Sequence, residues 1–289
     1  MTATLCEITP TAAERADERF GTAALQTAVA ALQDDGFVVI DDVVDHDHLD
    51  RLQERMSADL DTVLAQPVVP HNFVWGNVQQ SPPPDAGVVF RDVMANPFVC
   101  QVTRAVLGSG AFNDCLTGNT NVPGSGLQPV HVDDGQLWPH LSVAPPPARL
   151  VVNVPLSDVT DRNGAIELWP GTHHDTHMVL GNSIRVPEEL VAERRAVRPP
   201  LRGFTRKGAV LIRDMRLWHR GTANRSAAPR FMIAMIHSVA WYRRKRRFEL
   251  ERACAPVFAG CAIENAIPLV DTPKDHLTGN APYDYAGPN

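Results

Sequence analysis

Cysteine is scarce in this chain, and its spacing does not suggest pairing. The sequence holds only five cysteines in 289 residues, an odd number, and no two of them form a CxxC pair. Such usage is typical of a reducing compartment, where thiols stay free. We therefore expect a cytoplasmic protein.

Long apolar runs and an excess of basic charge are missing as well. No stretch approaches the length of apolar sequence that spans a bilayer, and residues 1–7 show no basic leader followed by an apolar stretch. The formal net charge is −6, so no overall basic field attracts nucleic acid or anionic lipid. We therefore expect a small-molecule substrate as the partner, no nucleic acid and no membrane, and a monomer or homodimer.

The composition that remains is that of an ordinary globular chain. Hydrophobic residues make up 44% of the sequence, which is enough to bury a full core at this length. We expect a single domain over 1–289. It would have a mostly helical N-terminal part at about 1–110, a strand-rich core at about 111–245 and a C-terminal extension at about 246–289.

The first third of the chain has the periodicity of helices. Apolar residues recur at helical intervals over 23–35, 48–64 and 97–107. Asp47 or Asp45 is placed to cap the second of these helices. The intervening stretch 66–92 is rich in Pro and Gly, so we expect a long loop there.

Short strand signals, separated by turn residues, recur through most of the remaining chain. We expect strands at 37–40, 115–122, 130–133, 149–156, 165–169, 197–204, 209–214 and 231–241. This number suits a mainly β fold with flanking helices, whose core is a double-stranded β-helix, the jelly roll of cupins. The N-terminal helices would then pack on one of its two sheets.

Three residues of the β-rich region have the types and spacing of metal ligands. His131 and Asp133 are two apart on an expected strand, so both side chains project to the same side. His219 would return from a distant strand to complete the set. Two imidazoles and one carboxylate cap one face of an octahedral ion and leave other positions open, the arrangement of non-haem Fe(II) oxygenases. The pattern predicts an iron centre.

Two other clusters of histidine and aspartate have simpler interpretations. Residues 45–48 stand where a helix cap is expected, and residues 173–177 follow a Pro-Gly turn in a loop. We therefore place the catalytic metal at the triad and not at either cluster.

The triad falls within an ordered series of motifs. The series runs Asp35-Gly36-Phe37-Val38-Val39, His131-Val132-Asp133, Asn163-Gly164, Trp169-Pro170-Gly171-Thr172-His173, His219 and Arg230. In this order the motifs resemble those of the phytanoyl-CoA dioxygenase family of Fe(II)/2-oxoglutarate-dependent oxygenases. The resemblance covers about residues 23–245. It implies the double-stranded β-helix fold and, as cofactors, iron(II), 2-oxoglutarate as cosubstrate and dioxygen.

The resemblance also implies how the cosubstrate is held. Arg230 opens an apolar strand, and a guanidinium binds a carboxylate through two parallel hydrogen bonds while staying charged when desolvated. It would anchor the distal carboxylate of 2-oxoglutarate. Gln128 stands where relatives contact the cosubstrate, and Asn119 with Thr117 would line the same cavity. Ile166 occupies a position where relatives often have threonine, so one contact is missing.

Asp133 bears on the type of reaction. In related halogenases a small residue takes this position and leaves a coordination site for chloride, which the carboxylate fills here. The resemblance therefore implies oxygenation of a substrate C–H bond, with 2-oxoglutarate converted to succinate and CO2. Hydroxylation is the default outcome, whereas desaturation or rearrangement would use the same oxidant with a different substrate geometry.

The substrate is expected to be a small organic molecule, with a secondary-metabolite intermediate as first choice, because this branch of the family commonly tailors such compounds. A free amino acid derivative or an acyl-CoA would be the next candidates. Trp75, His71 and Trp138 stand where relatives build substrate contacts, although hydrophobic packing is the other interpretation of these side chains. Two alternatives stay open. A non-catalytic jelly-roll binding protein would lack a ligand or Arg230, and a cupin-type metal-dependent isomerase or hydrolase would need no such arginine.

Overall fold

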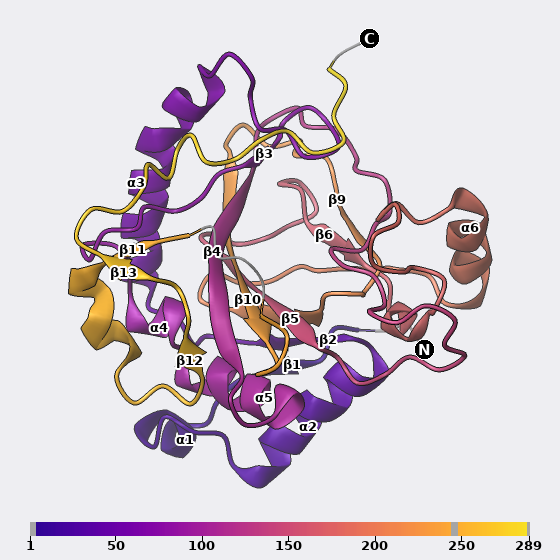
Figure 1. The fold of residues 1–289 in the computed structure, drawn as a ribbon, viewed down its shortest axis with the longest axis horizontal. Helices are drawn as coiled ribbons and strands as arrows, with labels where there is room; N and C mark the ends of the chain where they lie inside the picture. The colour runs from indigo at the N-terminus through magenta and orange to yellow at the C-terminus, as the bar shows by residue number, and fades with distance from the viewer. Residues whose placement is uncertain (1–3, 244–247, 288–289) are drawn as a thin grey trace.

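A computed structural model describes residues 4–243 and 248–287 of the chain. Most helices come from the first third of the sequence and most strands from the rest (Figure 1). In chain order the elements are β1 (Glu7–Ile8), α1 (Ala12–Ala16), α2 (Thr22–Asp34), β2 (Phe37–Ile40), α3 (His46–Leu64), β3 (Asn77–Gln79), α4 (Arg91–Met94), α5 (Pro97–Leu107), β4 (Phe112–Asn121), β5 (Arg149–Pro155), β6 (Ile166–Leu168), η1 (Thr172–His174), α6 (Glu188–Val197), β7 (Leu201–Arg202), β8 (Val210–Asp214), β9 (His219–Gly221), β10 (Arg230–Ser238), β11 (Leu250–Glu251), η2 (Arg252–Phe258), β12 (Glu264–Asn265) and β13 (Leu269–Val270).

The largest sheet in the described part of the chain has eight strands. Its order is β1-β2-β8-β5-β10-β4-β12, and β3 also pairs with β4. The central pairs β4–β10, β10–β5 and β5–β8 are all antiparallel. A smaller sheet has the order β7-β6-β9. Strands that are distant in sequence are therefore neighbours in space.

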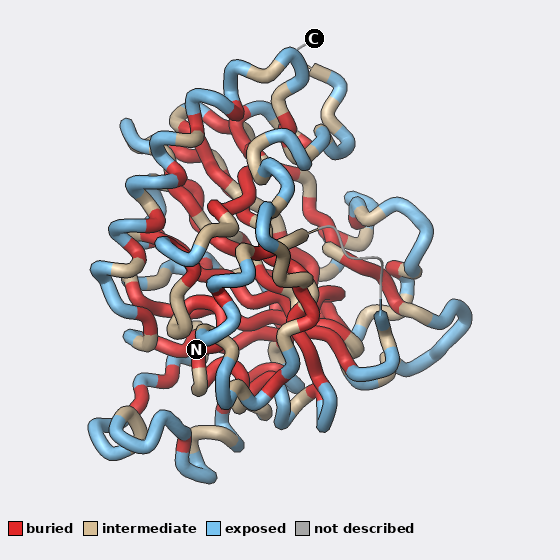
Figure 2. Tube along the Cα trace, turned by 60° about the vertical axis from the view of Figure 1, so that its left-hand side comes forward, coloured by how far each residue is buried: buried red, intermediate tan, exposed pale blue. Residues whose placement is uncertain are grey.

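The central strands send alternate residues to opposite sides of the large sheet, as the pleat of a strand requires. One set from β5 joins the apolar core cluster that includes α2, α3 and α5: Leu150, Val152 and Val154. The other set, Val151 and Asn153, lines a cavity. On β8, Ile212 belongs to the core cluster and Arg213 to the cavity. Figure 2 shows how the buried residues gather in the stacked strands.

The three predicted helices are confirmed, within one or two residues, as α2, α3 and α5. Asp45 caps α3, since its side chain accepts a hydrogen bond of 2.8 Å from the backbone N–H of Asp47. The predicted loop at 66–92 contains only the short strand β3 and the start of α4. No helix among the described residues combines the length and the apolarity that crossing a bilayer requires.

Two strand predictions need correction. The strand expected at 197–204 is wrong over its first half, because Val197 ends α6 and its side chain is 79% exposed. Acidic residues in the first turn of α6 and arginines in its last turn favour a helix, and the prolines at 199–200 end it. The segment 130–133 forms only single bridges, which His131 makes to His219 and Arg185.

Candidate active site

The three predicted metal ligands meet in the fold. The ligand atoms of His131, Asp133 and His219 all lie within 4.8 Å of one another. The backbones of the two histidines exchange a pair of N–H to O hydrogen bonds, each 2.9 Å long. Nε2 of His219 lies 3.5 Å from Oδ1 of Asp133. A single ion can therefore be shared by two segments that lie far apart in sequence.

Both imidazoles are oriented as metal-binding imidazoles are. Nδ1 of His131 lies 2.9 Å from the carbonyl oxygen of Pro129, and Nδ1 of His219 lies 2.9 Å from that of Leu217. Because a carbonyl only accepts, the neutral ring carries its proton on Nδ1 and leaves Nε2 free as a ligand. Burial and the neighbouring His219 lower the pKa of His131 to about 3, so its ring stays neutral near pH 7.

Asp133 is paired with an arginine that was not among the site residues predicted from the sequence. Nη2 of Arg213 donates to Oδ2 of Asp133 over 2.5 Å. Burial raises the pKa of Asp133, but the adjacent Arg213 guanidinium outweighs it, with a smaller contribution from the neighbouring His219, and holds this pKa well below its usual range. The carboxylate is therefore ionised and ready to bind a cation. The available signal was a charged pair, Arg213-Asp214, directly after the apolar run 210–212 on a strand.

The motif at 169–173 holds the segment that carries His219. The hydroxyl of Thr172 donates to the carbonyl oxygen of Trp169 over 2.7 Å and accepts from the backbone N–H of Trp218 over 3.0 Å. Since Trp218 directly precedes His219, this side chain fixes the backbone at the ligand. The motif acts through structure and supplies no ligand itself.

The Asn163-Gly164 motif supports the predicted cosubstrate arginine. Gly164 has a φ of +83°, and a Cβ there would lie 2.3 Å from Nδ2 of Asn121. Only glycine fits a positive φ at such a close approach. The carbonyl oxygen of Gly164 accepts a 2.9 Å hydrogen bond from Nη2 of Arg230. The glycine thereby sets the position of the guanidinium.

An inner cavity of about 260 Å³ adjoins the triad and takes its walls from both sheets. The three residues predicted to contact the cosubstrate, Arg230, Gln128 and Asn119, line it, as do Thr117 and Ile166. Burial lowers the pKa of Arg230 to about 10, so its guanidinium is still charged near pH 7. The amide of Gln128 is engaged with backbone: its Oε1 accepts from Gly221 and its Nε2 donates to Asn72.

The lining residues fit an iron ion together with a dicarboxylate. Two free imidazole nitrogens and an ionised carboxylate form the donor set of a non-haem iron site. Among the described residues, Nε of Arg230 and Nη1 of Arg213 are buried without a hydrogen-bond partner. Buried cationic donors of this kind are costly unless an anion satisfies them. The cavity therefore suits a ligand with negative charge.

An outer cavity of about 890 Å³ meets the inner one. Asp133, Thr117 and Ile236 are among the residues that line both. Much of the outer wall comes from the C-terminal segment, which we define as residues 248–285. This segment lies over the first third of the chain in Figure 1.

The C-terminal segment is hydrogen-bonded to residues that lie close to the triad. The backbone N–H of Tyr283 donates to His71, and the carbonyl oxygen of Tyr283 accepts from Phe73, each over 2.9 Å. The ring of Phe73 in turn lies 4.4 Å, centre to centre, from the imidazole of His131. The end of the chain therefore reaches the surroundings of the triad.

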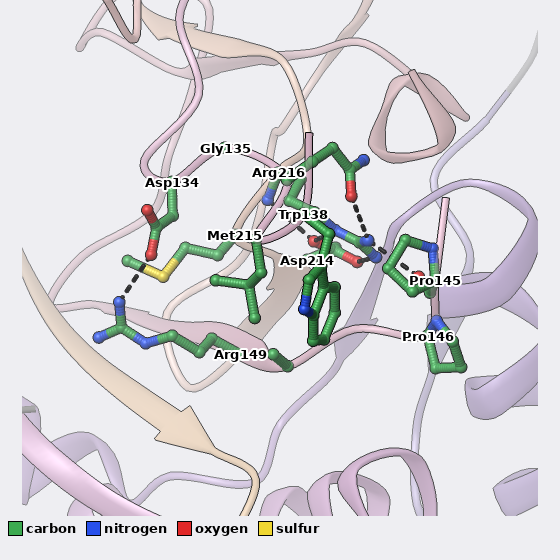
Figure 3. A pocket seen from close by; sticks show the side chains of 12 residues that line it. Asp134, Gly135, Trp138, Pro145, Pro146, Arg149, Asp214, Met215 and Arg216 are labelled. Carbon is green, nitrogen blue, oxygen red and sulfur yellow. Dashed lines mark hydrogen bonds and ion pairs between the residues drawn. The ribbon is translucent and has the colours of Figure 1, made fainter. Parts of the chain in front are cut away.

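The predicted substrate contacts lie elsewhere. Trp75 and Trp138 are 49% and 47% exposed, and neither they nor His71 line the inner or outer cavity. Trp138 borders another, smaller pocket, shown in Figure 3, which shares Met215 with both cavities and in which Arg149 binds Asp134 over 3.0 Å. His71 is buried against the ring of Tyr285.

The two rival clusters do not assemble into metal sites in the described part of the chain, where the triad is the one group with ligand geometry. His48 binds Asp92 over 2.9 Å, and the side chains of His173 and His174 contact the backbone of Gln33. These residues join elements of the fold to each other.

Comparison with known proteins links this geometry to a family. The profile of the family described as phytanoyl-CoA dioxygenase (PhyH) matches residues 32–232, which include the triad and Arg230. The structure is similar to that of the non-haem α-ketoglutarate-dependent epimerase SnoN from nogalamycin biosynthesis, with 18% identity, a TM-score of 0.57, and coverage of 76% of this chain and 85% of that one. The carbocyclase SnoK from the same biosynthesis, also α-ketoglutarate-dependent, gives 18% identity, a TM-score of 0.56, and coverage of 80% and 87%. At this identity the likeness shows a shared fold.

Proposed function

This chain belongs to the phytanoyl-CoA dioxygenase family, and from that membership we propose that it hydroxylates a C–H bond of a small organic molecule, an intermediate of secondary metabolism. Its cofactors are iron(II), 2-oxoglutarate and dioxygen. The reaction would release succinate and CO2. We further propose that the two sheets form a double-stranded β-helix, and that the protein works in the cytoplasm, where its five free thiols are stable.

The observation that carries this proposal is the state of the three ligands. Both Nδ1 atoms are held by backbone carbonyl groups, so both Nε2 atoms are available to the metal. The carboxylate of Asp133 is kept ionised by Arg213. A structural histidine has no need of this combined arrangement, whereas an iron site requires all of it.

The roles of the cavity residues follow from their charge and place. Arg230, still charged although buried, would bind the distal carboxylate of 2-oxoglutarate. Gln128 would act through the backbone it fixes, because its amide already bonds to Gly221 and Asn72. Asn119 lines the same cavity and would contact the cosubstrate directly.

Iron with 2-oxoglutarate and dioxygen supplies an oxidant strong enough to remove hydrogen from a C–H bond, and the protein supplies position and shelter. The ligands leave three positions of an octahedral ion for cosubstrate and dioxygen. The outer cavity would hold the substrate, since it meets the inner one at Asp133. Its volume of about 890 Å³ suits a molecule of natural-product size.

Two similar structures favour such a substrate. SnoN and SnoK both come from nogalamycin biosynthesis, where one is named an epimerase and the other a carbocyclase. The same fold thus serves several outcomes, and the shape of the substrate cavity selects among them. Hydroxylation is our proposal because it needs no second substrate group close to the reacting carbon.

An anaerobic titration tests the proposal. Iron(II) followed by 2-oxoglutarate should produce the weak visible charge-transfer band of a keto acid bound to iron. Compounds are then screened in air by the succinate that they cause to be released. The His219→Ala variant, which lacks one ligand, is the matched control and should give no band.

Absence of the band in the wild-type protein would refute the proposal. Metal-dependent turnover without 2-oxoglutarate would instead indicate an isomerase or hydrolase. A folded protein that binds neither iron nor keto acid would indicate a non-catalytic binding protein.

A further inference from the structure

Arg213 has a contact with an iron ligand and a hydrogen-bonding group to spare. It sits on β8, is only 4% exposed and lines the inner cavity. Its Nη2 donates to Oδ2 of Asp133, and its Nε donates over 3.2 Å to Oδ1 of Asn153. Its Nη1 has no partner in the described part of the chain.

The contact to Asp133 divides the two oxygens of that carboxylate. Oδ2 faces the guanidinium at 2.5 Å, whereas Oδ1 faces the second histidine ligand, 3.5 Å from Nε2 of His219. An oxygen held by a charge-assisted hydrogen bond is a poor second donor to the same metal. Asp133 would thus coordinate the metal through Oδ1 alone, which leaves one more coordination position of the metal open to another ligand.

The two arginines of the inner cavity lie at different places. Arg230 begins β10 and is tied to Gly164, while Arg213 is tied to the iron ligand Asp133. 2-Oxoglutarate also has two different ends, a distal carboxylate and a carboxylate next to the keto group. Only the second of these ends lies at the iron when the keto acid is bound.

We propose that Arg213 restricts Asp133 to one coordinating oxygen and binds, through Nη1, the carboxylate at the keto-acid end of 2-oxoglutarate. The inference rests on the proposed function, since it assigns one residue to that cosubstrate. It explains why the guanidinium of Arg213 is buried beside a metal ligand while its Nη1 has no hydrogen-bond partner among the described residues. Arg213 is then a residue that both positions a ligand and touches the cosubstrate.

Two keto acids separate this role from that of Arg230. Iron(II)-loaded protein is titrated without oxygen with 2-oxoglutarate and with 2-oxopentanoate, which has the keto-acid end but no distal carboxylate. The charge-transfer band reports binding without turnover. In Arg213→Met, both dissociation constants should rise by the same factor, about tenfold or more, the size of a lost charge-assisted hydrogen bond. In Arg230→Leu, only that of 2-oxoglutarate should rise.

Iron affinity gives a second readout, measured by competition with a chelating dye before keto acid is added. Arg213→Met should weaken iron(II) binding by about 10- to 100-fold, as is typical when a group that orients a ligand is removed. Arg213→Lys retains a charge beside Asp133 but has a single nitrogen. It should keep most of the iron affinity and still lose affinity for both keto acids.

The lysine variant keeps the test decisive if Arg213→Met fails to fold, which circular dichroism and thermal unfolding will reveal. Dissociation constants for both keto acids within twofold of wild type in a folded Arg213 variant would overturn the inference. So would a loss confined to 2-oxoglutarate, because the contact would then be at the distal end. If the wild-type protein gives no band, the proposed function itself fails.

Discussion

The two faces of the large sheet are built from the same strands but for different purposes. On the helix side, β5, β8 and β10 contribute aliphatic residues such as Val152, Ile212 and Ile233 to the core cluster. On the cavity side they contribute Asn153, Arg213 and Arg230. Consecutive residues on one strand therefore lie on opposite faces, one in the apolar core and the next in the polar cavity.

This difference has an energetic meaning. Each aliphatic side chain on the helix side stabilises the fold by about 1.5–3 kcal/mol when fully buried. A buried arginine has the opposite tendency, because removing its charge from water is costly unless a partner restores what is lost. The buried arginines on the cavity side thus lower the stability of the fold. Their partners are the metal ligand Asp133 and, by our proposal, the cosubstrate.

The largest effect is expected at the cavity side, from His219→Ala. Loss of one ligand should reduce iron-dependent succinate formation to the level of a sample without enzyme. The fold should persist, because His219 belongs to none of the apolar clusters. Succinate is measured by mass spectrometry and stability by thermal unfolding. Retained succinate formation would mean that the metal is held elsewhere.

The neighbouring residue of Arg213 on β8 should give the opposite result. Ile212→Ala should lower the free energy of unfolding by about 2–5 kcal/mol, since the side chain is fully buried among the helices. Affinity for 2-oxoglutarate in the folded fraction should stay within twofold. Urea unfolding measures the first and the anaerobic band the second. Ile212→Val, which removes a single methylene group, is the matched control.

Replacing Arg230, the proposed anchor of the distal carboxylate, should change the binding of 2-oxoglutarate and not the stability of the fold. Arg230→Leu should raise the KM for 2-oxoglutarate by about 10- to 100-fold, the equivalent of one lost charge-assisted hydrogen bond. Turnover at saturating cosubstrate should recover in part. Steady-state succinate assays over a range of 2-oxoglutarate measure this. An unchanged KM would show that the carboxylate binds at another residue.

A smaller effect is expected from a histidine on the helix side. Burial lowers the pKa of His237 to about 3, and its Nδ1 lies 2.7 Å from the hydroxyl of Thr103. The unfolded chain takes up a proton near pH 6.5, whereas the folded chain does not until about pH 3, so stability falls as the pH drops between these values. At pH 5 the loss from this group is about 2 kcal/mol.

Urea unfolding of iron-free protein at pH 8 and pH 5 measures that loss. His237→Gln, which does not titrate, should show a smaller difference between the two pH values than wild type. An equal difference in both proteins would mean that other groups dominate the acid response.

Much of the site could be predicted because its signals are local. His131 and Asp133 are two residues apart, and the motifs at 163–164 and 169–173 predict the turns that support the site. The helices were also predictable, since their apolar residues recur at helical intervals within one continuous stretch of sequence. The strand predicted at 197–204 failed because Val197 resembles a strand residue, although it is exposed at the end of a helix.

Arg213 could not be assigned in this way. It is 80 residues from Asp133 in sequence, and nothing local pairs the two side chains. The register of β8 against β5, in which Arg213 lies opposite Val151, brings its guanidinium to the cavity side and so to the iron ligand. The location of the C-terminal segment on the wall of the outer cavity could not be assigned either, because its sequence has little periodicity.

The sequence by itself therefore determined which residues are the candidate metal ligands, which arginine opens the last long strand, and the family to which the chain belongs. Only the tertiary structure decided which charge lies beside Asp133 and which segment lines the outer cavity. The physical reason is one of range. Ligand spacing and turn chemistry act over a few residues, whereas strand pairing and burial join residues that the sequence keeps far apart.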